Sequence, residues 1–259
     1  MAIPRAVLGF KNKLVNEFIS GPTEDVNYPF DNCRDYKTNT EWSPAANSGT
    51  LTITLLVITG LGASSAFGYF GIMSRNAASA GLSVTVRGYD LTSTLVKTIT
   101  ITSFTDGVPV MSVFDNFLCS QIQIDITWTS KLYVTTLAAG EAMWFDRTVS
   151  LGYQPARFAI KDKVQGFITE GNNVVQGRRI RGMKQEEAEV KLQKFDTVAA
   201  WYKDYVNHVL DTKILWFMAN DQIPSQVVHG VQDPTKLQDL SYSRPDKTDL
   251  KFSIEGWAQ

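Results

Sequence analysis

The sequence predicts a mainly β protein made of two sheet-rich domains and a single packed amphipathic helix. Three observations support this fold class. Short segments alternate apolar with hydroxyl or charged side chains, as half-buried antiparallel strands do. Turn-forming Gly, Asn and Asp residues separate these segments. One stretch near residue 200 has apolar residues at three- and four-residue steps, which is typical of a helix with one buried face.

The first half of the chain predicts an antiparallel β-sandwich, because several short strands with regularly spaced turns are typical of that architecture. The segments are rich in Val, Ile and Thr, which favour strands. No helix longer than a turn or two is expected before residue 190. The predicted strands are Leu51–Leu55, Leu82–Val86, Val96–Ile101 and Ile122–Trp128.

The second half predicts another β-domain with one helix across it, after a hinge expected in residues 142–155. Its helix is expected over about residues 196–210, with Asp196 or Thr197 as the N-cap. Its apolar stripe contains Phe195, Val198, Tyr202, Tyr205, Val206 and Val209. Strands are expected at Lys163–Thr169, Ile180, Ala188–Leu192, Ile214–Met218 and Leu250–Ile254.

Composition excludes several classes of protein. The 259 residues are 44% hydrophobic, enough for real cores, and the 25 basic and 26 acidic side chains give a net charge of −1. This balance argues against binding nucleic acid through whole-chain electrostatics. Two cysteines are too few for a disulfide framework, and two histidines exclude a three-histidine metal site. The sequence contains no 18-residue apolar run and no signal peptide. We therefore expect the protein to be made in a cytoplasm and not to insert into a membrane.

No constellation of catalytic residues is found, so we predict a protein that is not an enzyme and uses no cofactor. Ser74 and Ser241 lie in no Gly-x-Ser-x-Gly context, and Cys33 and Cys119 show no paired base. His229 is expected in a loop after a strand. The Gly-x-Gly at residues 60–62 lacks the third glycine of a dinucleotide-binding loop and favours a turn.

Three arginines, Arg178, Arg179 and Arg181, form the densest basic cluster, between Gly177 and Gly182. Two interpretations stay open. The cluster is a solvated hairpin tip, balanced by the glutamates that follow it, or it is an interface for an acidic protein surface. Aromatic residues for stacking on bases do not accompany it, so nucleic acid is not an expected partner.

Acidic residues near the start of the chain offer oxygen ligands of the kind that calcium prefers. Asp31, Asp35 and Glu41 lie close in sequence to Asn32 and Asn39. They lack the spacing of a calcium-binding loop, so capping of polar loops is favoured and no metal site is predicted.

Short motifs in residues 25–146 resemble a discoidin-like, galactose-binding-type jelly roll. They include Tyr28–Asn32 (YPFDN) and Thr40–Ser43 (TEWS) before the first core strand, and Gly140–Phe145 (GEAMWF) at the end. The resemblance implies a jelly-roll sandwich with a ligand rim at its loop end. Here that rim offers Tyr36, Lys37 and Arg75 beside small residues, which suits a protein surface better than a sugar.

The second half is similar to the core domain of bacteriophage tail-tip proteins, including distal tail proteins. The likeness rests on Gly166-Phe167, Gly177–Arg179, the helix and Leu215–Phe217. It implies a structural protein of the virion tail, assembled in the host cytoplasm as a homo-oligomeric ring that joins the tail tube to baseplate or fibre proteins. The implied domains are an N-terminal arm (1–24), a discoidin-like sandwich (25–146) and a ring domain (147–259).

An alternative function stays open, namely a carbohydrate-binding module that recognises a glycan of the host cell surface. The two halves also differ in charge. Residues 1–146 have a net charge of −3 and residues 147–259 a net charge of +2, so we expect the second domain of one subunit to attract the first domain of a neighbour.

Overall fold

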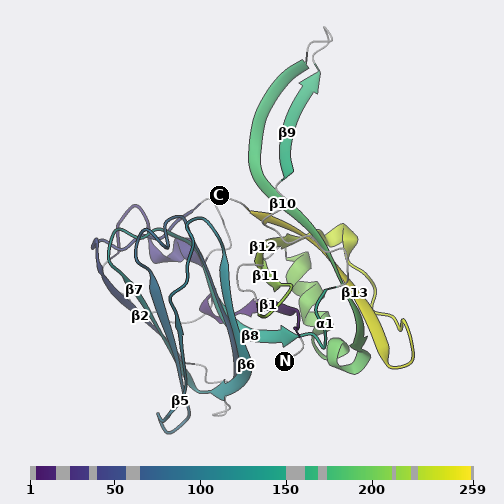
Figure 1. Ribbon diagram of the computed structural model, residues 1–259, viewed down its shortest axis with the longest axis horizontal. Coiled ribbons are helices and arrows are strands. Elements are labelled where there is room, and N and C mark those ends of the chain that lie inside the picture. The colour runs from purple at the N-terminus through teal and green to yellow at the C-terminus, as the bar shows by residue number, and fades with distance from the viewer. Residues whose placement is uncertain are drawn as a thin grey trace. The chain divides into compact units, whose positions relative to one another are not determined.

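A computed structural model of the protein describes residues 4–15, 24–34, 40–56, 65–149, 161–168, 174–211, 214–222 and 227–257. It is a mainly β structure with antiparallel sheets and one α-helix in this described part, which confirms the predicted fold class (Figure 1). The chain forms two compact units. One is Leu8–Met143, and the other combines Met1–Val7 with Trp144–Gln259.

The first unit is a jelly-roll sandwich of two sheets. Its four predicted strands are confirmed, shifted or extended by a few residues, and they form one sheet in the order β2-β7-β4-β5. Their bounds are β2 Gly49–Leu56, β4 Ser83–Tyr89, β5 Leu95–Ile101 and β7 Gln121–Trp128. The other sheet has the order β6-β3-β8-β1, with β1 Val7–Asn12, β3 Ser65–Ser74, β6 Val110–Cys119 and β8 Val134–Trp144.

Alternation explains why the four-stranded sheet has one apolar face. Ile53 of β2 lies opposite Ile124 of β7, which in turn lies opposite Val86 of β4, and all three are buried. The opposite face is polar. There Asp125 accepts a hydrogen bond from Thr52 at 2.8 Å and pairs with Arg87. A one-residue slip in register would exchange these two faces, so the core fixes the pairing.

Residues 7–12, which the sequence analysis assigns to an N-terminal arm, form strand β1. Val7, Leu8 and Phe10 of this strand are buried. Because the strand is covered on both faces, its sequence is a continuous apolar run without the period-2 alternation that identified the other strands.

The sheet of the second unit has the order β11-β12-β13-β10-β9. Its strands are β9 Lys161–Ile168, β10 Val174–Lys194, β11 Leu215–Met218, β12 Val227–Gln232 and β13 Lys247–Trp257. The helix α1, Phe195–Leu210, lies against this sheet. Tyr205 of α1 makes an edge-to-face contact with Phe252 of β13, with ring centroids 5.9 Å apart.

Two details of α1 correct the sequence analysis. The helix begins at Phe195 with Lys194 as its N-cap, so Asp196 and Thr197 lie inside the first turn and do not cap it. Trp201 is part of the buried face, whereas Tyr202 is only half-buried. No helix in the part of the chain that the structure describes is long and apolar enough to span a membrane.

Strand β10 is a single 21-residue strand where the sequence predicts two. Its second half pairs with β13 from Met183 to Lys194, and its first half pairs with β9 from Val174 to Met183. Among the described residues, Val174–Gly182 therefore have β9 as their only neighbouring strand. Figure 1 shows β9 and this part of β10 continuing past the rest of the sheet as a two-stranded ribbon, which we call the arm.

Candidate functional site

The arginine cluster lies in the arm. Arg178, Arg179 and Arg181 are within β10, where Arg179 is opposite Val164 of β9, so they belong to the body of a strand and not to a turn. Residues 161–184 carry six basic and two acidic side chains, a net charge of +4. All other residues of the chain together have a net charge of −5. Positive charge is thus concentrated on the arm.

Arg75 is the one rim candidate that the structure describes, because Tyr36 and Lys37 lie outside the described residues. Its guanidinium carbon is 4.2 Å from the centroid of the Tyr133 ring, within the range of a cation–π contact. A terminal nitrogen lies 3.7 Å from a carboxylate oxygen of Glu41, and 55% of the Arg75 side chain is exposed. Tyr28 completes the group, since its ring meets that of Tyr133 edge to face at 5.7 Å.

We call the group of Arg75, Glu41, Tyr133 and Tyr28 the Arg75 rim. Hydrogen bonds hold the loops that carry it. The Asn76 side chain donates to the carbonyl of Lys131 at 2.6 Å and accepts from the backbone N–H of Tyr133 at 3.0 Å. The Lys131 ammonium donates to Asp25 at 3.3 Å. The pKa of Asp25 is lowered, chiefly because the backbone N–H of Asn27 donates to its carboxylate, with a further contribution from Lys131.

The acidic residues considered for calcium have other partners. Asp31 pairs with Arg34 at 2.5 Å, and Glu41 faces Arg75. Asp35 lies outside the described residues. Within the described ranges, no group of three or more His, Cys, Asp or Glu side chains is placed to hold a metal ion.

Three of the residues screened as nucleophiles, Ser74, Cys33 and Cys119, are buried in the first unit, whereas Ser241 is exposed in the second unit. Ser74 accepts a hydrogen bond from the backbone N–H of Asn76 at 3.3 Å. Cys33 and Cys119 are buried in the core as thiols and not as a disulfide, and the Cys33 thiol donates to the carbonyl of Phe30 at 3.1 Å. Burial raises the pKa of the Cys119 thiol to about 11, so the nucleophilic thiolate is scarce at neutral pH.

His229 is not in a loop, which corrects the sequence analysis. It lies within β12, and its ring centroid is 4.3 Å from that of Trp216 on β11. Only 1% of its surface is exposed, and neither ring nitrogen has a hydrogen-bond partner in the described part of the protein. Burial lowers the pKa of His229 to about 3, so the ring is neutral.

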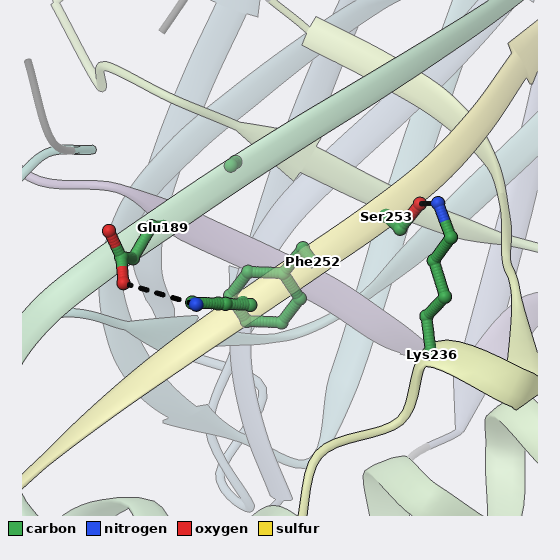
Figure 2. A pocket seen from close by; sticks show the side chains of 6 residues that line it. Glu189, Lys236, Phe252 and Ser253 are labelled. Carbon is green, nitrogen blue, oxygen red and sulfur yellow. Dashed lines mark hydrogen bonds and ion pairs between the residues drawn. The ribbon is translucent and has the colours of Figure 1, made fainter. Parts of the chain in front are cut away.

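A shallow hollow that the sequence analysis missed lies on the sheet of the second unit (Figure 2). It is lined by Glu189 of β10, by Lys251 and Ser253 of β13, and by Lys236 from a short 3-10 turn. Lys236 donates to the Ser253 hydroxyl at 3.1 Å, and Lys251 lies 3.8 Å from Glu189. Cross-strand register brings these side chains together, since Glu189 is opposite Lys251. No spacing in the sequence indicates that pairing.

Comparison with known proteins finds no matching family model and no matching curated protein. Solved structures do match. One is a chitosan-binding module from a chitosanase/glucanase of Paenibacillus sp. IK-5, with 16% identity over 49% of this chain and 97% of that chain and a TM-score of 0.37.

Two others are similar. A fucose-binding module of Streptococcus pneumoniae has 11% identity over 50% of this chain and 96% of that chain, with a TM-score of 0.38. The lectin domain of lectinolysin, solved with Lewis b antigen, has 11% identity over 51% of this chain and 98% of that chain, with a TM-score of 0.40. A likeness at this level concerns the fold alone, and it extends over about half of the protein.

Proposed function

We propose that this protein acts by assembly and not by catalysis, as a structural subunit that repeats in a multi-copy particle. The arm carries this proposal. A ribbon of two strands is at best marginally stable in water, whereas a third strand or a packed surface stabilises it. Among the described strands, no third strand pairs along Val174–Gly182. A partner chain would supply it.

The particle we propose is a bacteriophage tail, with this chain in a ring that joins the tail tube to baseplate or fibre proteins. The resemblance of the second half to tail-tip proteins supports this finer assignment. Two compact sheet-built units and a net charge near zero also suit the close packing of many copies.

Light scattering on the purified chain tests the assembly function. We expect a stable multimer for the full chain. In the matched variant, an Asn-Gly turn replaces residues 162–182. This two-residue turn connects Lys161 to Met183, which lies opposite it in the strand pairing. We expect this armless variant to be monomeric while α1 keeps its helical circular dichroism. A full-length chain that stays monomeric at high concentration would overturn the proposal.

A second candidate function is the recognition of a cell-surface glycan by the jelly roll. One observation favours it. At the Arg75 rim, a half-exposed guanidinium, a carboxylate and a tyrosine ring lie side by side, and these groups bind sugar hydroxyls and sugar faces. A glycan array tests this candidate. Binding that is lost in Arg75→Ala and Tyr36→Ala but kept in Lys203→Ala would support it, and an array without signal would exclude the glycans printed on it.

A further inference from the structure

Strand β5 is an open edge of the first unit. It ends the four-stranded sheet, and β4 is its only neighbour among the described strands. The strand is mostly exposed, including apolar side chains. Leu95 is 51% exposed and Val96 is 48% exposed, and Leu91 in the preceding turn is exposed as well. A single charged residue, Lys97, lies within residues 91–101.

Soluble proteins normally protect such an edge. Lysines, prolines, bulges or a covering element keep its free backbone N–H and C=O groups from pairing with another chain. Strand β5 has one lysine and no proline, and its one bulge lies at the beginning of the strand, between Leu95 and Lys97, which pair with Tyr89 and Gly88 of β4. An apolar edge without further protection is therefore a surface on which a foreign strand can pair.

The arm has the complementary features. Among the described strands, none pairs with the outer edges of its two strands, and its net charge is +4. Residues 8–143, the first unit, carry eleven acidic and eight basic side chains, a net charge of −3. Asp90 lies just before β5, and its pKa is lowered because the Thr92 hydroxyl and the backbone of Thr94 donate to its carboxylate. A negative charge is thus fixed at the start of the open edge.

From these features we infer that the arm of one copy adds as an extra strand pair along β5 of a second copy. This inference rests on the proposed assembly function and specifies which two surfaces of neighbouring copies touch. Backbone hydrogen bonds would supply affinity, and Leu95 and Val96 would be covered by the arm. The two surfaces differ, so the contact is head to tail, and a head-to-tail contact closes into a ring when its rotation allows.

Cross-linking between two differently labelled full-length chains tests the contact. One chain carries Val96→Cys on β5 and the other carries Gln176→Cys on the arm. The native cysteines are buried, so they contribute little background. After mixing and exchange of subunits, a short bis-maleimide should give the heterodimer. The control replaces Val96→Cys by Val26→Cys, at a far more exposed position of the same unit, and should give at least 10-fold less product.

A second variant separates this inference from the proposed function. The double substitution Leu95→Lys and Val96→Lys adds charges to exposed positions, so we expect the fold to persist and the dissociation constant of the multimer to rise at least 10-fold. Leu210→Lys, at an exposed position of α1, should leave it unchanged. If the multimer persists in the double variant without the β5 cross-link, the arm docks elsewhere and this inference fails while the assembly function stands. If the unmodified chain is a monomer, the assembly function fails first.

Discussion

At the scale of single residues, His229 should make stability depend on pH. Its pKa is about 3 in the folded protein and about 6.5 in an unfolded chain. Below pH 6.5 the unfolded state binds a proton that the folded state does not, so stability falls as the pH drops toward 3. The slope is about 1.4 kcal/mol per pH unit, or about 2 kcal/mol lost at pH 5 relative to pH 7. At pH 7 and above the residue contributes no such dependence.

Denaturant unfolding at pH 7 and pH 5 measures this loss. His229→Phe keeps a ring against Trp216 and removes the titrating group, so the loss between the two pH values should shrink by about 2 kcal/mol in the variant. Carboxylates that titrate over the same range act equally on both proteins and cancel in the comparison. An identical loss in the two proteins would show that the ring is protonated in the folded state.

Residues that meet through folding were beyond sequence reasoning. Arg75 was identified as a rim residue, but its partners Glu41 and Tyr133 come from distant segments that only the sandwich brings together. The run Val227-Val228-His229-Gly230 predicts a loop after a strand at His229, yet the residue lies within β12. This strand is buried on both faces, so the pattern of a half-buried strand is missing.

At the scale of elements, period-2 and period-3.6 patterns of apolar residues predicted the strands and the helix that have one buried face. β2, β4, β7 and α1 each bury one face or stripe and expose the other, β5 packs against the core only through Ile99 and Ile101, and all five were predicted. Strand β10 shows the limit of this approach. Its glycines, Gly177 and Gly182, indicate breaks in the sequence, yet each lies at a register shift in the pairing with β9, between Gln176 and Arg179 and between Ile180 and Met183. A glycine inside a strand marks a bulge as readily as an end.

At the scale of the whole molecule, the separation of charge predicts how assembly responds to salt. The arm has a net charge of +4 and the rest of the chain −5, so we expect copies to attract through surfaces of opposite sign although the net charge is only −1. The Debye length falls from about 10 Å at 0.1 M salt to about 3 Å at 1 M, which screens exposed charges from each other. Association should therefore weaken steadily between these two salt concentrations.

Charge reversal on the arm separates this attraction from backbone pairing. With Arg178→Glu, Arg179→Glu and Arg181→Glu, the arm changes from +4 to −2 and repels the acidic remainder, so association should be weak at low salt and should recover as salt screens the repulsion. The control Lys191→Glu, Lys203→Glu and Lys236→Glu changes the net charge equally but leaves the arm basic, and it should keep the original sign of the salt dependence. A multimer that sediments identically in all three proteins at every salt concentration would mean that the arm's charge plays no part in bringing copies together.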